Sequence, residues 1–296
     1  MAERFRGVIT PILTPFDDDL GVARDLYLAH ARASLAGGAH YLAPFGTTSE
    51  AASLSLRERT QLLELLVTSG AAKARQLMPG TGLCSLEETA CLTRHAVDLG
   101  CAMVLVLPPW FYVNAGDDGL YRYFSLLIER VGSDDLKICL YHIPQLAGIG
   151  ISPALAARLN AAFPETVVAL KDSSGDWENT RAVIEAAPGL SVFPGSERFL
   201  CDAVRLGGGG CISASCNSNV TAIRALYDLA VAGRWSKAEA ARRPIEAHRK
   251  ALEAGGLIPA LKSLKAQQTG DARWLNLRPP LENADPALGP VVAATL

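Results

Sequence analysis

Short apolar segments alternate with longer amphipathic segments along most of the chain, roughly every 30 residues. The short segments are rich in β-branched residues and end in turn residues, which predicts buried strands. Eight strands are predicted, at Val8–Leu13, His40–Pro44, Gln76–Pro79, Met103–Leu107, Lys137–His142, Val167–Lys171, Ser191–Pro194 and Gly210–Ser213. Helical spacing of apolar residues predicts helices between them, at Leu56–Ser69, Leu86–Leu99, Gly119–Val131, Pro153–Ala162 and Asn179–Ala187.

The regular alternation of strands and helices indicates a parallel sheet, and eight such units predict a closed (β/α)8 TIM barrel. An open, doubly wound sheet is the alternative. It would call for a Gly-x-Gly-x-x-Gly motif after an early strand, and the sequence has none. Beyond Val220 the pattern is helical over more residues than one closing helix needs. We therefore predict a barrel domain at residues 1–234 and a C-terminal helical extension at residues 235–296.

Composition narrows the kinds of partner. The chain is 49% hydrophobic, which suffices for a large core, and its net charge of −2 gives no reason to expect nucleic acid or an anionic membrane as a partner. The segment Met1–Arg6 lacks the apolar stretch of a signal peptide, and no apolar run reaches the roughly 18 residues of a membrane span. We expect a cytoplasmic protein.

The cysteines and histidines do not form a recognisable framework. The seven cysteines include no Cys-x-x-Cys pair, and the five histidines include no His-Glu-x-x-His motif. Buried thiols in a reducing compartment explain the cysteines better than disulfides or zinc do. We expect no metal and no cofactor.

Lys171 is the lysine that closes an apolar strand, at the end of Val167–Lys171. Burial disfavours the charged form of an amine, and an uncharged amine can attack a ketone to form a Schiff base. Tyr141 lies near the end of the preceding strand, Lys137–His142. In a barrel both side chains reach the face at which the strands end, where active sites lie. An amine beside a phenol that can transfer protons indicates carbonyl chemistry.

A turn after the second predicted strand adds hydroxyl groups at the same face. Gly46 is followed by Thr47 and Thr48. Their hydroxyl and backbone N–H groups can hold a small carboxylate and orient Tyr141.

Four segments together resemble the signatures of the dihydrodipicolinate synthase/N-acetylneuraminate lyase family. They are Gly7–Phe16, Gly46–Glu50, Tyr141–Pro144 and Leu170–Gly175. Members of this family are class I enzymes that form a Schiff base on a (β/α)8 barrel with C-terminal helices, and many are homotetramers. The resemblance implies that pyruvate, or a 2-oxo acid that yields it, binds to the lysine, and that the chain forms a tetramer or dimer.

The resemblance also implies residue roles. Lys171 corresponds to the Schiff-base residue and Tyr141 to the proton donor and acceptor. Thr47 and Thr48 would bind the carboxylate of the 2-oxo acid, and the threonines would join the proton relay, Thr48 as a catalytic residue. Synthases of the family carry a second tyrosine that reaches across a subunit interface, which makes Tyr112 a further catalytic candidate, with Phe111 beside it.

Other positions concern the rest of the substrate. Lyases of this family hold the hydroxyl groups of a sugar acid where Gly195, Glu197 and Ser213 stand, which implies that these three bind substrate. In the synthases an arginine grips the carboxylate of the aldehyde, whereas this chain has Leu146 there, and leucine cannot form that bidentate contact. Ser49 replaces a glycine usual in the family and would be strained if the position requires a positive φ.

These observations predict a class I aldolase that cleaves a 2-oxo-3-deoxy sugar acid, or a similar 4-hydroxy-2-oxo acid, into pyruvate and an aldehyde. A dehydratase acting through the same imine is one alternative. 4-Hydroxy-tetrahydrodipicolinate synthase is another, which Leu146 disfavours. A protein that binds a 2-oxo acid without catalysis is the third, and the presence of both Lys171 and Tyr141 argues against it.

Overall fold

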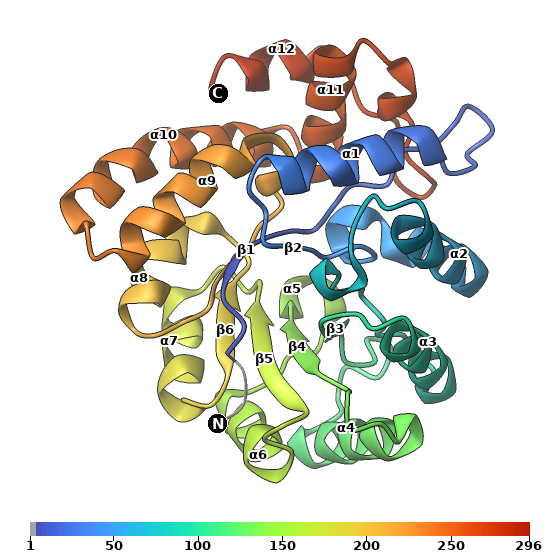
Figure 1. The fold of residues 1–296 in the computed structure, drawn as a ribbon, viewed down its shortest axis with the longest axis vertical. Coiled ribbons are helices and arrows are strands. Elements are labelled where there is room, and N and C mark those ends of the chain that lie inside the picture. Colours follow the sequence, from blue (N-terminus) through green and yellow to red (C-terminus); the bar gives the residue numbers. More distant parts are fainter. Residues whose placement is uncertain (1–3) are drawn as a thin grey trace.

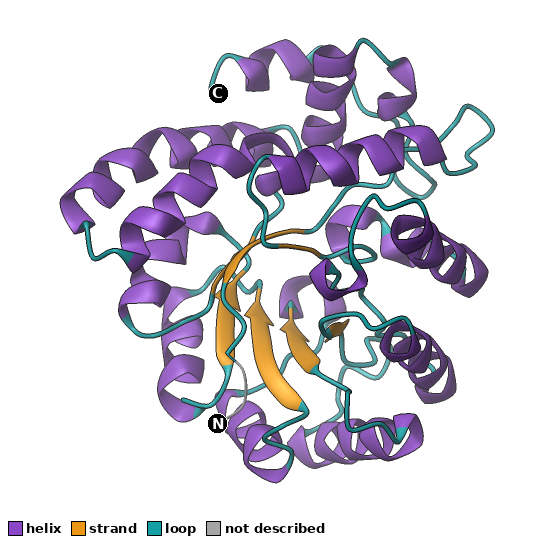
Figure 2. Cartoon of the chain, in the orientation of Figure 1, coloured by secondary structure: helices purple, strands orange, loops and turns teal. Residues whose placement is uncertain are grey.

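Parallel strands form the centre of the molecule and helices surround them (Figure 1; Figure 2). The computed structural model describes residues 4–296. The strands are β1 (Gly7–Thr10), β2 (Tyr41–Leu42), β3 (Val104–Val106), β4 (Ile138–His142), β5 (Val167–Asp172), β6 (Ser191–Pro194) and β7 (Gly210–Ile212). They pair in the orders β2-β1-β7 and β3-β4-β5-β6, and each of these pairs is parallel.

The predicted strand Gln76–Pro79 is wrong as a regular strand, but its backbone joins the two sheets. The Met78 N–H donates to the Leu42 carbonyl of β2 at 2.8 Å, and the Pro79 carbonyl accepts from the Leu105 N–H of β3 at 2.9 Å. Proline has no N–H to give to a ladder, so the pairing is reduced to isolated bridges. The segment still occupies the position between β2 and β3 that the barrel requires.

Glycines allow the other junction of the two sheets. Gly209 donates to the Val192 carbonyl of β6 at 2.8 Å and accepts from the Gly7 N–H of β1 at 2.7 Å. Gly210 has φ +136°, and a Cβ there would stand 2.0 Å from the Gly7 carbonyl oxygen. No side chain fits at that distance, so only glycine permits this approach. With both junctions made, the predicted (β/α)8 barrel is confirmed.

Amphipathic helices cover the barrel (Figure 1). In α4 the buried residues Leu120, Phe124, Leu127 and Val131 recur every three or four positions and form one apolar face. The helices are α1 (Arg24–Ala36), α2 (Leu56–Thr68), α3 (Leu86–Asp98), α4 (Asp117–Val131), α5 (Pro144–Ala147), α6 (Pro153–Ala162), α7 (Trp177–Ala186), α8 (Leu200–Arg205) and α9 (Cys216–Val231). Short 3-10 turns are η1 (Thr47–Ser49), η2 (Ala51–Ser53), η3 (Ala74–Gln76) and η4 (Glu197–Phe199).

The chain ends in helices that pack on the barrel rather than standing apart from it. They are α10 (Trp235–Ala254), α11 (Leu257–Thr269), the 3-10 turn η5 (Ala272–Leu275) and α12 (Leu288–Ala293). Val8 of β1 shares a hydrophobic cluster with Ala238 and Ile245 of α10. Leu13 belongs to a second cluster with Leu261 of α11. The boundary at residue 234 stays a prediction, because these helices share their apolar contacts with the barrel.

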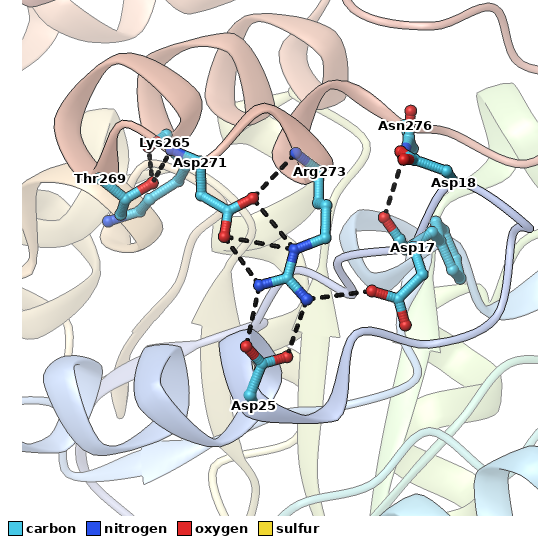
Figure 3. A network of polar contacts seen from close by, with 9 residues as sticks. Asp17, Asp18, Asp25, Lys265, Thr269, Asp271, Arg273 and Asn276 are labelled. Atoms are coloured by element: carbon cyan, nitrogen blue, oxygen red, sulfur yellow. Dashed lines mark hydrogen bonds and ion pairs between the residues drawn. The ribbon is translucent and has the colours of Figure 1, made fainter.

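An ion-pair network ties η5 to α1 and to the segment before it (Figure 3). Arg273 contacts Asp17 at 3.0 Å, Asp25 at 2.8 Å and Asp271 at 2.7 Å. Hydrogen bonds from its guanidinium, together with its charge, hold the pKa values of Asp25 and Asp271 below their usual range. The Arg273 side chain is about one-third exposed, so water screens these ion pairs and they stabilise the junction only modestly.

Among residues 4–296, no helix combines the length and the apolar character needed to cross a membrane.

Candidate active site

Lys171 and Tyr141 lie side by side at the ends of β5 and β4. The two residues are paired in the strand register, and each is only 4% exposed. The Lys171 Nζ lies 4.2 Å from the centre of the Tyr141 ring. Residues on either side of Lys171 are buried as well, because a parallel strand in a barrel is covered on both faces. The strands therefore deliver the amine and the phenol to one point.

The turn η1 brings its hydroxyl groups to the same point. Thr47 Oγ1 lies 3.0 Å from the Tyr141 hydroxyl, within hydrogen-bond distance. Thr48 is buried and lines the same cavity as Thr47, Tyr141 and Lys171. The four residues that the sequence motifs single out thus converge in one place, with a direct path for a proton from Tyr141 to Thr47.

Ser49 is not strained, because its position does not require a positive φ. It is not among the residues with positive φ, whereas the next residue, Glu50, has φ 55°. The Ser49 hydroxyl donates to the Ile12 carbonyl at 2.5 Å, and the Ser49 carbonyl accepts from the Thr14 hydroxyl at 2.8 Å. The serine therefore attaches the threonine turn to the segment that follows β1.

A buried ion pair that sequence reasoning missed also holds this turn. Lys262 of α11 forms an ion pair with Glu50, and both side chains are fully buried. Lys262 Nζ also donates to the Asn276 carbonyl at 2.8 Å, and Glu50 Oε2 accepts from the Arg278 N–H at 3.2 Å. Burial lowers the pKa of Lys262 to about 8, against the opposing effect of Glu50. The C-terminal helices thus contact the loop that carries Thr47 and Thr48.

A cavity of about 260 Å³ opens above Lys171. Gly195, which the resemblance implies for substrate binding, is among the residues that line it. A Cβ at Gly195 would stand 2.3 Å from the Ser173 hydroxyl, so a larger residue would push into the neighbouring turn. The other lining residues are Thr47, Thr48, Tyr141, Ile143, Gln145, Leu146, Lys171, Asp172, Ser173, Gly175, Ser196, Arg198, Ile212, Ala214, Arg249, Glu253 and Leu257.

Glu197 and Ser213 do not line the cavity, although the resemblance implied direct contact with substrate. Glu197 is fully buried and accepts a hydrogen bond from the Ser213 hydroxyl. Arg249 of α10 covers both, with its Nη1 3.1 Å from the Ser213 oxygen and 3.6 Å from Glu197 Oε2. Arg249 itself lines the cavity, so the arginine, and not the buried Glu197 carboxylate, is exposed to a bound molecule there.

Tyr112 does not reach the cavity of its own chain. It is 70% exposed, and its ring packs edge-on against Phe111, which is 77% exposed. Leu146 is 66% exposed on α5 and lines the mouth of the cavity.

A second, more apolar cavity of about 480 Å³ adjoins the first and shares Tyr141 and Leu146 with it. Trp110, Leu105 and Leu281 also line this second cavity.

The cysteines are unpaired, and Cys139, Cys201, Cys211 and Cys216 are buried. Within residues 4–296, no group of three or more His, Cys, Asp or Glu side chains is arranged to hold a metal ion.

Comparison with known proteins gives matches over the whole length of the chain. The profile of the "Dihydrodipicolinate synthetase family" matches residues 4–296. An "Uncharacterized DapA-like lyase" of Chloroflexus aurantiacus is 34% identical over 277 residues, which cover 93% of this chain and 91% of that protein.

Solved structures agree with this result. The dihydrodipicolinate synthase from Agrobacterium tumefaciens superposes with a TM-score of 0.89 at 33% identity, covering 98% of this chain and 97% of that one. The dihydrodipicolinate synthase from Acinetobacter baumannii, solved in complex with pyruvate, gives a TM-score of 0.88 at 26% identity, covering 98% and 97%.

Proposed function

The chain belongs to the dihydrodipicolinate synthetase family, as its motifs predicted, and from that premise we propose a specific reaction for it. The enzyme is a class I, Schiff-base-forming aldolase. It cleaves a 2-oxo-3-deoxy sugar acid, or a similar 4-hydroxy-2-oxo acid, into pyruvate and an aldehyde. The observation that carries the proposal is the contact of Lys171 with Tyr141 and of Tyr141 with Thr47 at the base of one cavity.

The first half of the reaction makes an electron sink. The Lys171 amine adds to the C2 ketone of the substrate and forms a carbinolamine. Tyr141 gives its proton to the carbinolamine hydroxyl, which leaves as water, and an iminium joins Nζ to C2. The hydroxyl and N–H groups of Thr47 and Thr48 hold the substrate carboxylate, and the Thr47 hydroxyl stabilises the tyrosinate by hydrogen bonding.

The second half breaks the carbon–carbon bond. The Tyr141 oxygen takes the proton of the C4 hydroxyl, the C3–C4 bond breaks, and its electron pair moves into the iminium to form an enamine. C4 leaves as an aldehyde. Tyr141 returns a proton to C3, which converts the enamine back into an iminium. Water then adds at C2 and gives a proton to the Tyr141 oxygen, and collapse of the resulting carbinolamine releases pyruvate and restores the Lys171 amine. Tyr141 thus recovers each proton that it gives, and the water that leaves in the first half is replaced in the second, so the cycle consumes nothing besides the substrate.

Leu146 favours cleavage over the synthase reaction. It lies at the cavity mouth where the synthases would place an arginine, and its apolar side chain cannot bind the carboxylate of an aldehyde substrate. The similarity to named synthases is the observation that keeps 4-hydroxy-tetrahydrodipicolinate synthase as the second candidate. A dehydratase would start from the same iminium and differ in losing water instead of an aldehyde.

Assembly into a homo-oligomer, a tetramer or a dimer, is part of this proposal. Phe111 and Tyr112 form an exposed aromatic pair just beyond Trp110, which lines the second cavity. Exposed aromatic side chains beside an apolar hollow are typical of a protein interface. We propose that this pair packs against a second copy of the chain, where Tyr112 would serve the partner's site. Tyr112→Ala should lower the mass of the assembly in sedimentation, and an unchanged mass would argue against this interface.

Product identification tests the proposed reaction. The enzyme is incubated with a panel of 2-oxo-3-deoxy acids, and pyruvate is followed with lactate dehydrogenase while the aldehyde is trapped with a hydrazine. The proposal expects the two products in equal amounts and none with Lys171→Met, which keeps the length of the side chain. Release of an intact, dehydrated 2-oxo acid would instead identify a dehydratase. Efficient condensation of pyruvate with aspartate semialdehyde would identify the synthase.

A further inference from the structure

One wall of the cavity carries charged groups that the proposed mechanism does not use. Arg198 lies in η4, and Arg249 and Glu253 come from α10. α10 belongs to the C-terminal helices, which pack on the barrel beside α9 (Figure 1). This wall, formed by Arg198, Arg249 and Glu253, can contact a part of the substrate that Lys171 and the threonines do not hold.

Arg249 is fixed in place but keeps a free donor. Its side chain is 11% exposed. Nε donates to Glu253 at 2.7 Å, and Nη1 donates to Ser213 at 3.1 Å. Within residues 4–296, Nη2 has no hydrogen-bond acceptor, so a substrate oxygen can take that position. The buried carboxylate of Glu197, 3.6 Å from Nη1, holds the guanidinium from below.

Glu253 supplies the complementary acceptor. One of its oxygens, Oε1, accepts from Arg249 and lies 3.4 Å from Arg198 Nη2. Its other oxygen has no donor among the residues that the structure describes. A hydroxyl group both donates and accepts, so two neighbouring hydroxyls can bind the free Arg249 donor and the free Glu253 oxygen together.

The charges of this wall are balanced before any substrate binds. The two arginines of the wall form ion pairs with two carboxylates, Glu253 in the wall and Glu197 buried behind it. A second carboxylate on the substrate would meet two carboxylates close by, and like charges disfavour each other. Leu146 adds no cation at the mouth of the cavity. An uncharged, hydroxylated tail fits this wall better than an anionic one.

We propose that Arg249 and Glu253 bind the hydroxyl groups of an uncharged substrate tail, and that the enzyme thereby prefers 2-oxo-3-deoxy acids that end in a hydroxymethyl group over those that end in a second carboxylate. The inference rests on the proposed aldolase reaction and adds to it the chemistry of the distal end of the substrate.

Aldol addition of pyruvate to matched aldehydes tests this specificity. Glyceraldehyde and tartronate semialdehyde differ only in ending in CH₂OH or COO⁻, and propionaldehyde has no hydroxyl on its tail. We expect kcat/KM for glyceraldehyde to exceed that for tartronate semialdehyde by about tenfold or more. Glu253→Gln should reduce this preference about tenfold, because it removes one negative charge without changing the size of the side chain.

Arg249→Lys should reduce the preference for glyceraldehyde over propionaldehyde about tenfold, because lysine keeps a charge beside Glu197 but lacks the free donor. Lys250→Met, at the next and exposed position of α10, should change neither ratio. A wild-type preference for tartronate semialdehyde, or ratios that both variants leave unchanged, would overturn the proposal. Borohydride trapping of pyruvate on the wild type and each variant separates a failure of the aldolase mechanism from a failure of the tail-binding proposal. If the wild-type enzyme forms no adduct, the aldolase mechanism itself is contradicted.

Discussion

Lys262→Met removes one partner of the buried ion pair that connects α11 to the threonine loop. Both Lys262 and Glu50 are fully buried, so the substitution leaves a carboxylate without a cation in a site that water does not reach. Breaking such a pair on one side costs about 3–5 kcal/mol of unfolding free energy. Glu50→Gln should cost a comparable amount, reduced to the extent that Lys262 can release its proton.

The double variant should recover most of this loss. The pKa of Lys262 is lowered to about 8 because the cost of burial exceeds the attraction of Glu50. The pair itself is therefore not a large source of stability, and replacing both charges at once leaves no unpaired ion. We expect Lys262→Met/Glu50→Gln to lie within about 2 kcal/mol of the wild type, which makes the coupling energy between the two sites about 3 kcal/mol or more.

Equilibrium unfolding in guanidinium chloride at one fixed protein concentration measures these values for the four proteins of the cycle. Lys250→Met serves as the control for an exposed lysine and should change stability by less than about 0.5 kcal/mol. The KM for the 2-oxo acid should rise in both single variants, because Thr47 and Thr48 directly precede the anchored segment. Single variants that each cost less than about 1 kcal/mol, or effects that simply add, would refute the reasoning.

Three further predictions concern the chemistry and the acid stability. Tyr141→Phe should lower kcat about a hundredfold or more, measured by pyruvate release, because the phenol that exchanges protons is lost; a change below about threefold would exclude Tyr141 from that role. Leu146→Arg should raise the rate of pyruvate condensation with aspartate semialdehyde about tenfold, since it restores a bidentate carboxylate contact, and an unchanged rate would contradict the significance given to Leu146. Arg278 lowers the pKa of Glu58 from 4.5 to about 2, so the stability that this contact gives is complete above about pH 4.5 and is lost as the pH falls toward 2. In denaturant unfolding measured at a series of pH values, Glu58→Gln should reduce the loss of unfolding free energy between pH 4.5 and 2 by roughly 1–3 kcal/mol. An unaltered pH profile would show that the contact contributes nothing.

The repeating pattern of the chain predicts the barrel well because burial controls that pattern. β-Branched runs such as Val167–Lys171 form strands wherever they are covered on both faces, and an apolar face such as that of α4 has only one place to pack. Gln76–Pro79 is the exception among the predicted strands. Its apolar residues are buried like those of a strand, but Pro79 lacks the N–H that a regular ladder needs. The residue pattern predicts burial, and hydrogen bonding decides whether a buried segment is a regular strand.

The candidate site also has a part that the sequence predicts and a part that it does not. Lys171, Tyr141, Thr47 and Thr48 could be predicted because each lies at the end of a strand or in the loop that follows one, and the barrel brings these together at one face.

Other parts of the site depend on the C-terminal helices. Arg249 could not be predicted, since it lies in a polar helix whose position over β7 follows only from packing. The same packing places Lys262 against Glu50 and buries Glu197 beneath Arg249.

Borohydride reduction of the enzyme in the presence of pyruvate tests the central claim most directly. If Lys171 forms an iminium with pyruvate, reduction fixes the three carbons on the protein, and intact mass should increase by pyruvic acid less one oxygen atom. Peptide mapping should place the whole increment on Lys171, and Lys171→Met should gain none. An unmodified enzyme, or an adduct on any other lysine, would contradict the mechanism.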